Sequence, residues 1–150
     1  MSGGAKSTVV VTGATGFVGS HIALALVENG FRVRGAVRSP DKGGWLEARG
    51  VELVRADLTD KASLVLAFRG ADAVVSNAAL GSNQGDMDDF MRVNCEGVRD
   101  LMDATAESGV KRVVHVSSVA VYRTRLWRAM DEATRGYPTD KRVFNWSDAT

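Results

Sequence analysis

Three glycines, Gly13, Gly16 and Gly19, lie between a run of β-branched residues and a helical pattern. The first permits a tight turn out of a strand, the second lets the backbone approach a pyrophosphate, and the third lets a helix pack closely on a sheet. The start of that helix offers N–H groups and a partial positive charge to phosphates. The spacing predicts a dinucleotide site; the alternative is a tight turn in another kind of α/β protein. The candidate residues of the turn are Gly13, Thr15, Gly16, Phe17, Val18 and Gly19.

The end of the second predicted strand indicates which dinucleotide binds. Proteins that bind NAD usually carry Asp or Glu there, about 20 residues after the turn, on the ribose 2′-hydroxyl. This chain has Arg38 and Ser39 at that place and no carboxylate before Asp41. Arg38 can pair with a 2′-phosphate through its planar guanidinium, and Ser39 can add a hydroxyl. The sequence therefore favours NADP(H) over NAD(H), although Arg38 can equally be a solvated charge at the strand's end.

Short apolar runs alternate with helical patterns up to residue 122. The predicted strands cover residues 8–12, 31–37, 51–55, 73–76 and 112–117. The predicted helices cover residues 17–29, 60–69 and about 86–108, with a short helix or turn at 40–49. This alternation is typical of a parallel sheet covered on both faces, and right-handed crossovers give the strand order 3-2-1-4-5. The predicted fold class is α/β, a Rossmann-type doubly wound sheet of at least five strands in three layers.

The sequence pattern divides the chain into two regions, of which only the first predicts regular structure clearly. Residues 1–122 are expected to form a dinucleotide-binding domain. Residues 123–150 form an irregular tail, which we expect to be the start of an active-site loop or of a substrate region.

Composition narrows the classes of protein. A net charge of +1 over 150 residues gives no sign of a nucleic-acid surface or a polybasic membrane patch. No apolar run approaches the roughly 20 residues of a membrane span, and the first residues show no apolar signal region. The one cysteine, Cys95, excludes an intrachain disulfide; it is either a small helix residue among apolar groups or a reactive thiol. Together these features favour the cytoplasm, and no metal site is predicted.

Five motifs in order resemble the extended branch of the short-chain dehydrogenase/reductase superfamily. That branch includes sugar-nucleotide epimerases and dehydratases, and carbonyl reductases similar to dihydroflavonol reductase. The motifs are Thr12-Gly-Ala-Thr-Gly-Phe-Val-Gly-Ser-His21, Ala56-Asp-Leu-Thr-Asp60, Ser76-Asn-Ala-Ala79, Val93-Asn-Cys-Glu-Gly97 and Val116-Ser-Ser-Val-Ala-Val-Tyr122.

The resemblance implies roles for several residues at the cofactor. Asp57 and Leu58 would meet the adenine, although Asp57 could instead cap the next helix. Asn94 belongs to the signature of the long helix and could also simply bond neighbouring backbone. Three further residues would back the cofactor after the fourth strand: Asn77, Ala78 and Ala79.

The resemblance also implies a catalytic Ser, Tyr and Lys. Ser118 stands where the family has its catalytic hydroxyl, with Ser117 second, whereas His115 is expected to pack in the core. Tyr137 and Lys141 have the required spacing of four residues, which places both side chains on one face of a helix. The surrounding tail also resembles the loop before the tyrosine helix, in which case the true pair would lie beyond residue 150.

The expected function is that of an NADP(H)-dependent oxidoreductase that acts on a small carbonyl or alcohol substrate by hydride transfer. The alternatives are an epimerase or dehydratase of the sugar-nucleotide type, and a non-catalytic dinucleotide-binding sensor or subunit. An exposed sheet edge or apolar face is expected near the fifth strand, which predicts a homodimer or association with a complementing chain.

Overall fold

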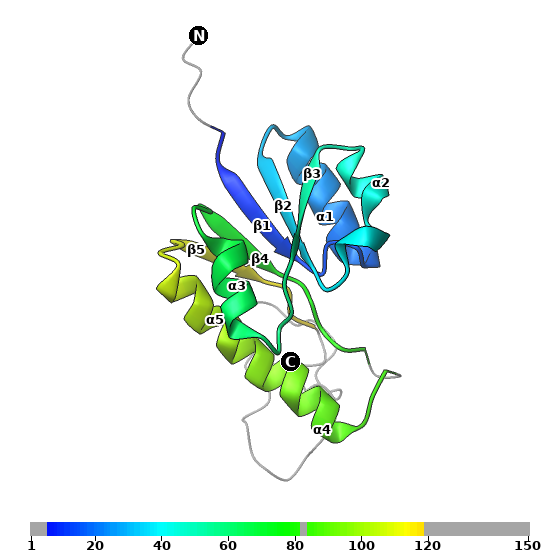
Figure 1. Ribbon diagram of the computed structural model, residues 1–150, viewed down its shortest axis with the longest axis vertical. Coiled ribbons are helices and arrows are strands. Elements are labelled where there is room, and N and C mark those ends of the chain that lie inside the picture. Colours follow the sequence, from blue (N-terminus) through cyan, green and yellow to red (C-terminus); the bar gives the residue numbers. More distant parts are fainter. Residues whose placement is uncertain (1–5, 82–83, 119–150) are drawn as a thin grey trace, which may run out of the picture.

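The computed structural model of the protein describes residues 6–81 and 84–118. Within them lies a five-stranded sheet in which all neighbouring strands are parallel, in the order β3-β2-β1-β4-β5 (Figure 1). The strands are β1 Thr8–Thr12, β2 Arg32–Val37, β3 Val51–Arg55, β4 Ala73–Ser76 and β5 Arg112–His115. The predicted Rossmann-type fold and its strand order are confirmed.

Helices cover both faces of the sheet, which gives the three predicted layers (Figure 1). On one face lie α1 Phe17–Glu28 and α2 Gly44–Glu47, and on the other lie α3 Lys61–Phe68, α4 Met87–Phe90 and α5 Gly97–Glu107. Gly30 ends α1 with a φ of 85°, and Asp60 caps α3 by accepting from the Ser63 N–H at 3.2 Å. Both ends follow from local chemistry, because glycine tolerates the left-handed region and aspartate is a favourable N-cap.

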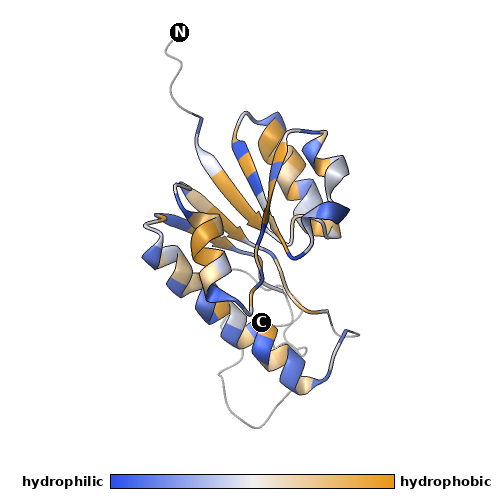
Figure 2. Ribbon diagram, viewed as in Figure 1, coloured by the Kyte–Doolittle hydropathy of each residue, from blue (hydrophilic) through white to orange (hydrophobic). Residues whose placement is uncertain are grey.

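The central strand β1 divides two apolar clusters. Val10 packs with α3 and α5 on one face, whereas Val9 and Val11 pack with α1 and α2 on the other. All five residues of β1 are buried, as expected for a strand covered on both sides. In Figure 2, hydrophobic residues run along the buried strand β1, whereas hydrophilic residues recur at intervals along α5. The burial of β1 fixes the position from which the glycine turn starts.

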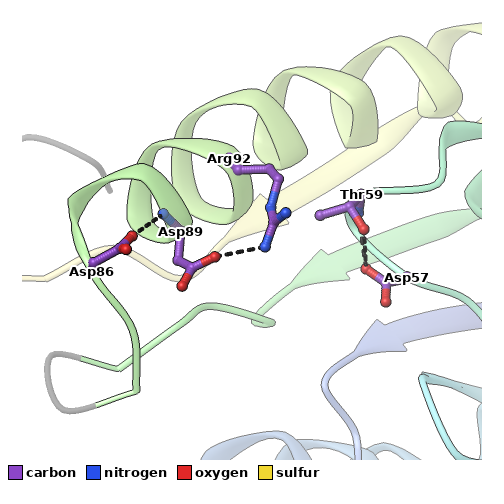
Figure 3. A network of polar contacts seen from close by, with 5 residues as sticks. All are labelled: Asp57, Thr59, Asp86, Asp89 and Arg92. Atoms are coloured by element: carbon purple, nitrogen blue, oxygen red, sulfur yellow. Dashed lines mark hydrogen bonds and ion pairs between the residues drawn. The ribbon is translucent and has the colours of Figure 1, made fainter.

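The long helix predicted at about 86–108 begins at Met87 and is not regular throughout. A π-helical segment, Met91–Glu96, separates α4 from α5. At the start of α4, the side chain of Asp86 accepts from the Asp89 N–H at 3.0 Å, and Asp89 forms an ion pair with Arg92 at 2.6 Å (Figure 3). The apolar pattern does not reveal the segment, since one extra residue in a turn changes the periodicity very little. Such π-helical turns are frequent at functional sites.

Strand β5 lies at one edge of the described sheet and ends at His115, two residues earlier than predicted. The expectation that His115 packs in the core is wrong, because the residue is exposed. Its Nδ1 lies 3.0 Å from Ser76 Oγ, within hydrogen-bonding distance on the neighbouring strand. Val114 is 53% exposed and Val116 41% exposed. Association through this part of the molecule remains a prediction.

The division into residues 1–122 and 123–150 also remains a prediction, since most of the second region lies outside the described residues. None of the helices in residues 6–81 and 84–118 could span a membrane. Within the same residues, no group of His, Cys, Asp and Glu side chains could hold a metal ion.

The contact between α5 and the segment after β3 yields a stability prediction. A Cβ on Gly97 would lie 2.9 Å from Leu58 Cβ and 3.2 Å from Leu58 O. The overpacking of Gly97→Ala should cost about 1–3 kcal/mol, offset by roughly 1 kcal/mol of improved helix propensity. We therefore expect a net loss of about 1 kcal/mol in the free energy of unfolding by urea.

Gly44→Ala is the matched control for this variant, because nothing lies within 4 Å of the added carbon. It should leave the urea midpoint unchanged or raise it slightly. A midpoint for Gly97→Ala equal to that of Gly44→Ala would contradict the packing argument.

Candidate nucleotide-binding site

A pocket of about 460 Å³ opens at the carboxyl ends of the strands, where ligands bind in open α/β sheets. Most of its described lining comes from four segments. These are Thr12, Gly13, Thr15 and Gly16 at the glycine turn, residues 36–39 with Lys42 after β2, 56–58 after β3, and 77–80 after β4. Leu64, Gln84 and Val93 also line it. Most of the predicted cofactor residues, scattered over the sequence, therefore line one cavity.

The glycine turn joins β1 to α1 by backbone contacts alone. Gly13 has a φ of 66°, which glycine adopts without strain, and its N–H donates to Ala36 O at 3.0 Å. The Gly16 N–H donates to Gly13 O at 2.9 Å and closes the turn. Among the described residues, no side chain caps the start of α1. Its first N–H groups are therefore left for water or a ligand, and the helix dipole favours an anion there.

Two of these glycines are required by space. A Cβ on Gly19 would lie 2.2 Å from Gly13 O and 2.8 Å from Asn77 Nδ2. One on Gly13 would lie 3.0 Å from Ala78 Cα. The contacts at position 19 are too short for any side chain. At position 13 the contact is tight, and the positive φ of 66° strains any residue other than glycine. The close approach of the turn, the helix and the segment after β4 therefore depends on both glycines.

Other predicted residues of the turn lie differently. Thr15 and Gly16 line the pocket, whereas Phe17, Val18 and Gly19 are outside its lining. The side chain of Phe17 is 84% exposed and faces His21, with the ring centroids 4.9 Å apart. The predicted roles of Phe17 and Val18 could thus be filled by their backbone N–H groups, and they remain predictions.

Thr12 is a site residue that the sequence analysis did not single out as one. Its Oγ1 accepts from the N–H groups of Asn77 and Ala78, both at 3.0 Å, and lies 3.4 Å from Val75 O. Thr12 is buried at the end of β1 and lines the pocket. One hydroxyl therefore fixes the segment after β4 to the strand that precedes the glycine turn. The signal available in the sequence was a hydroxyl residue directly before the first glycine.

Positive charge gathers at the opening next to β2. Arg38 and Ser39 line the pocket and are exposed, as is Lys42, which the sequence analysis did not propose. Lys42 reaches the pocket because a 3-10 turn, Pro40–Lys42, folds the chain back. Neither Arg38 nor Lys42 forms an ion pair with any other described residue. Both cations are therefore available to an anionic ligand.

Asp57 is the carboxylate among the described lining residues. Its Oδ1 accepts from the N–H and the hydroxyl of Thr59, both at 2.9 Å (Figure 3). The cap of α3 is Asp60, so Asp57 does not serve as the helix cap that was its alternative role. The side chain is held in place by Thr59, and Leu58 beside it is buried. Both residues lie where the adenine is expected, and that role remains a prediction.

Asn94 contributes to the site through another residue. Its Oδ1 accepts from the Leu80 N–H at 2.8 Å and its Nδ2 donates to Leu80 O at 3.1 Å. Asn94 is 3% exposed and lies outside the pocket lining, whereas Leu80 is part of that lining with Asn77, Ala78 and Ala79. The π-helical segment thus places an amide that fixes the pocket wall after β4.

The predicted catalytic residues are only partly described. Ser118 lies three residues beyond the end of β5, is half-buried and is not part of the pocket lining. Tyr137 and Lys141 lie outside the described residues. The catalytic assignment therefore stays a prediction.

Cys95 lies in the π-helical segment and is half-buried, with Sγ 3.8 Å from Met91 Sδ. Burial raises the pKa of the thiol above its ordinary value, the nearby Glu96 adds to this, and Arg99 opposes it. A raised pKa keeps the thiol protonated at neutral pH, which favours the structural interpretation over a reactive nucleophile.

Comparison with known proteins agrees with the fold. The model of the NAD dependent epimerase/dehydratase family matches residues 9–146. The chain belongs to this family. The match confirms the resemblance drawn from the motifs, and a reductase is among the relatives of this chain.

Three relatives illustrate the range of similarity. Cinnamoyl-CoA reductase 1 of Oryza sativa subsp. japonica is 41% identical over 122 residues, which cover 77% of this chain and 35% of that protein. The crystal structure of gox2253 superposes with a TM-score of 0.81 at 33% identity, covering 96% of this chain and 44% of that one. A short-chain dehydrogenase/reductase superfamily protein from Agrobacterium tumefaciens with bound NAD has a TM-score of 0.65 at 36% identity, covering 77% and 34%. The chain thus spans about a third to just under half of each relative.

The role of Thr12 can be tested by substitution. Thr12→Val keeps the shape but removes the acceptor for two backbone N–H groups, and an unsatisfied buried donor costs about 1–3 kcal/mol. We expect the free energy of unfolding to fall by that amount, which lowers the urea midpoint. Cofactor binding should also weaken as the segment after β4 shifts. Thr12→Ser keeps the hydroxyl and is the control. Equal stability of the valine and serine variants would show that the hydroxyl bonds are unimportant.

Proposed function

We propose that this chain forms the cofactor-binding part of an NADP(H)-dependent oxidoreductase that reduces a carbonyl or oxidises an alcohol. The observation that carries the proposal is one pocket lined by two groups suited to anions. These groups are the glycine turn, followed by the uncapped start of α1, and the cations Arg38 and Lys42.

The residues present fit a dinucleotide with a 2′-phosphate. Gly13 and Gly16 would hold the pyrophosphate, because no side chain there keeps the backbone away from it. Arg38, with Ser39 and Lys42, would hold the 2′-phosphate, where proteins that prefer NAD place a carboxylate. Arginine suits this task, since its planar fork can donate two parallel bonds to a phosphate. The family's description names NAD, so the preference for NADP(H) is the specific part of the proposal.

A carbonyl or alcohol substrate is favoured by the reductase among the relatives and by the motif around Ser118. When bound, the nicotinamide supplies or accepts the hydride. The Ser118 hydroxyl would donate a hydrogen bond to the substrate oxygen. A tyrosine hydroxyl, with Tyr137 as the candidate, would give that oxygen its proton during reduction and take it back during oxidation. The ammonium of Lys141 would lower the pKa of the tyrosine.

An epimerase or dehydratase is the second candidate, favoured by the family's own description. Such an enzyme takes a hydride from its substrate and returns it within one turnover, so the same cofactor pocket serves. Net consumption of NADPH distinguishes the two functions, because only the oxidoreductase converts cofactor in proportion to product.

The cofactor preference can be tested by titration with NADPH and NADH. Arg38→Met should raise the Kd for NADPH about 10- to 100-fold, since a charge-assisted bond contributes about 1.5–3 kcal/mol. The Kd for NADH should change little. Arg55→Met is the control, because Arg55 is an exposed arginine at the end of β3 and does not line the pocket. An unchanged NADPH affinity in Arg38→Met would contradict the assignment.

The catalytic assignment can be tested by following nicotinamide absorbance with a panel of ketones and aldehydes. Ser118→Ala and Tyr137→Phe should each lower kcat by about 10²–10⁴, as expected on loss of a proton donor or its partner, with NADPH affinity unchanged. Full activity of Tyr137→Phe would exclude Tyr137 as the proton donor. Absence of turnover with every substrate, despite tight NADPH binding, would contradict an oxidoreductase of this type.

A further inference from the structure

Two glycines, Gly35 and Gly43, lie close to the side chain of Leu53. A Cβ on Gly35, in β2, would lie 2.9 Å from Leu53 Cδ2 and 2.9 Å from Ala14 Cβ. A Cβ on Gly43 would lie 2.3 Å from Leu53 Cδ1 and 3.2 Å from Thr15 Cγ2. The two methyl groups of Leu53 are thus each pressed against a glycine. Since Ala14 and Thr15 both belong to the glycine turn, these close contacts form a ring that starts and ends there.

Gly43 is the point at which this ring reaches residues 38–43, the segment that carries the pocket's cations. Its N–H donates to Pro40 O at 2.8 Å, and its carbonyl accepts from the Leu46 N–H at 2.8 Å. The residue is buried between the 3-10 turn and α2. With its backbone held on both sides, Gly43 cannot move without moving the segment.

A side chain at Gly43 is opposed by close contacts and not by backbone conformation. Its φ is −111°, which any residue can adopt. Its neighbour Gly44 also has no left-handed φ, and nothing lies within 4 Å of a Cβ built on it. The chain therefore offers two adjacent glycines, of which only the first is in close contact.

We propose that Gly43 is a positioning residue for cofactor selectivity, because it lets residues 38–43 lie against Thr15 and Leu53. That contact sets the separation between the glycine turn and the pair Arg38 and Lys42. The inference rests on the proposed binding of NADP(H). The pyrophosphate and the 2′-phosphate belong to one molecule, so their two binding places must match it to within about 0.5 Å. A Cβ at position 43 would meet Leu53 Cδ1 and Thr15 Cγ2, so these side chains or residues 38–43 must shift to make room for it, and a shift of the segment moves the cations with it.

Displacement of residues 38–43 affects the two cofactors differently. NADH has no 2′-phosphate, so a shift of Arg38 and Lys42 removes little from its binding. The glycine turn itself keeps its place through the Gly13 N–H bond to Ala36 O and the contacts of Thr12. A change at Gly43 should therefore alter the ratio of the two affinities and not the affinity for dinucleotides in general.

The experiment measures the Kd values for NADPH and NADH in the wild type, Gly43→Ala and Gly44→Ala. For Gly43→Ala we expect the NADPH Kd to rise about tenfold, the effect of one misaligned charge-assisted bond, with less than about a threefold change for NADH. Gly44→Ala should match the wild type for both. An unchanged ratio, or an equal loss for both cofactors, in Gly43→Ala overturns the role of Gly43.

Leu53 provides the reciprocal test. Leu53→Ala removes the methyl group that an alanine at position 43 would meet, so Gly43→Ala combined with Leu53→Ala should regain the wild-type ratio. Leu53→Ala alone loosens the contact and should raise the NADPH Kd by about threefold with NADH unchanged. Should Gly43→Ala not fold, this single variant decides the matter, and a wild-type ratio in it overturns the proposal.

The results that would contradict the role of Gly43 differ from those that would contradict the proposed preference for NADP(H). Wild-type protein that binds NADH as tightly as NADPH contradicts the preference for NADP(H), and the inference with it. Wild-type preference for NADPH that persists unchanged in Gly43→Ala contradicts only the role of Gly43. Unfolding temperatures of all variants show whether a change in affinity reflects a loss of folded protein, which would affect both cofactors alike.

Discussion

The close approach of backbone to backbone at the end of β1 is the constraint on which the site depends. A Cβ built on Gly19 would lie 2.2 Å from Gly13 O, and one built on Gly13 would lie 3.0 Å from Ala78 Cα. The start of α1 can therefore reach the sheet edge with its N–H groups uncovered. A single methyl group at either glycine would separate the helix, the turn and the segment after β4, and the pocket would lose its phosphate-binding end.

Buried hydrogen bonds keep the opposite wall of the pocket in register with this turn. Thr12 Oγ1 holds the N–H groups of Asn77 and Ala78, and Asn94 holds both polar backbone atoms of Leu80. Because a buried polar group left without a partner costs about 1–3 kcal/mol, each bond strongly favours one arrangement of the wall. The π-helical segment contributes to these hydrogen bonds, since it contains the buried Asn94.

Much of the fold could be predicted from local chemistry, whereas part of the site could not. The elements followed from local periodicity, and the strand order followed from their alternation and the right-handed crossover rule. A short helix or turn was predicted at 40–49, but the sequence does not show that Lys42 of this turn reaches the pocket, and Asn94 bonds a residue 14 positions away. The exposure of His115 depends on the edge position of β5, which periodicity does not show.

The pocket is lined by two kinds of structure, a backbone turn and exposed side chains. The glycine turn is made of backbone in close contact, which leaves little space for a side chain at Gly13 or Gly19. The end next to β2 is made of exposed side chains on a short turn, which can be exchanged at little cost in stability. A family with this arrangement can vary cofactor preference through a few surface residues, provided that the segment carrying them stays in contact with the turn. In this chain Gly35 and Gly43 provide that contact by closing on Leu53.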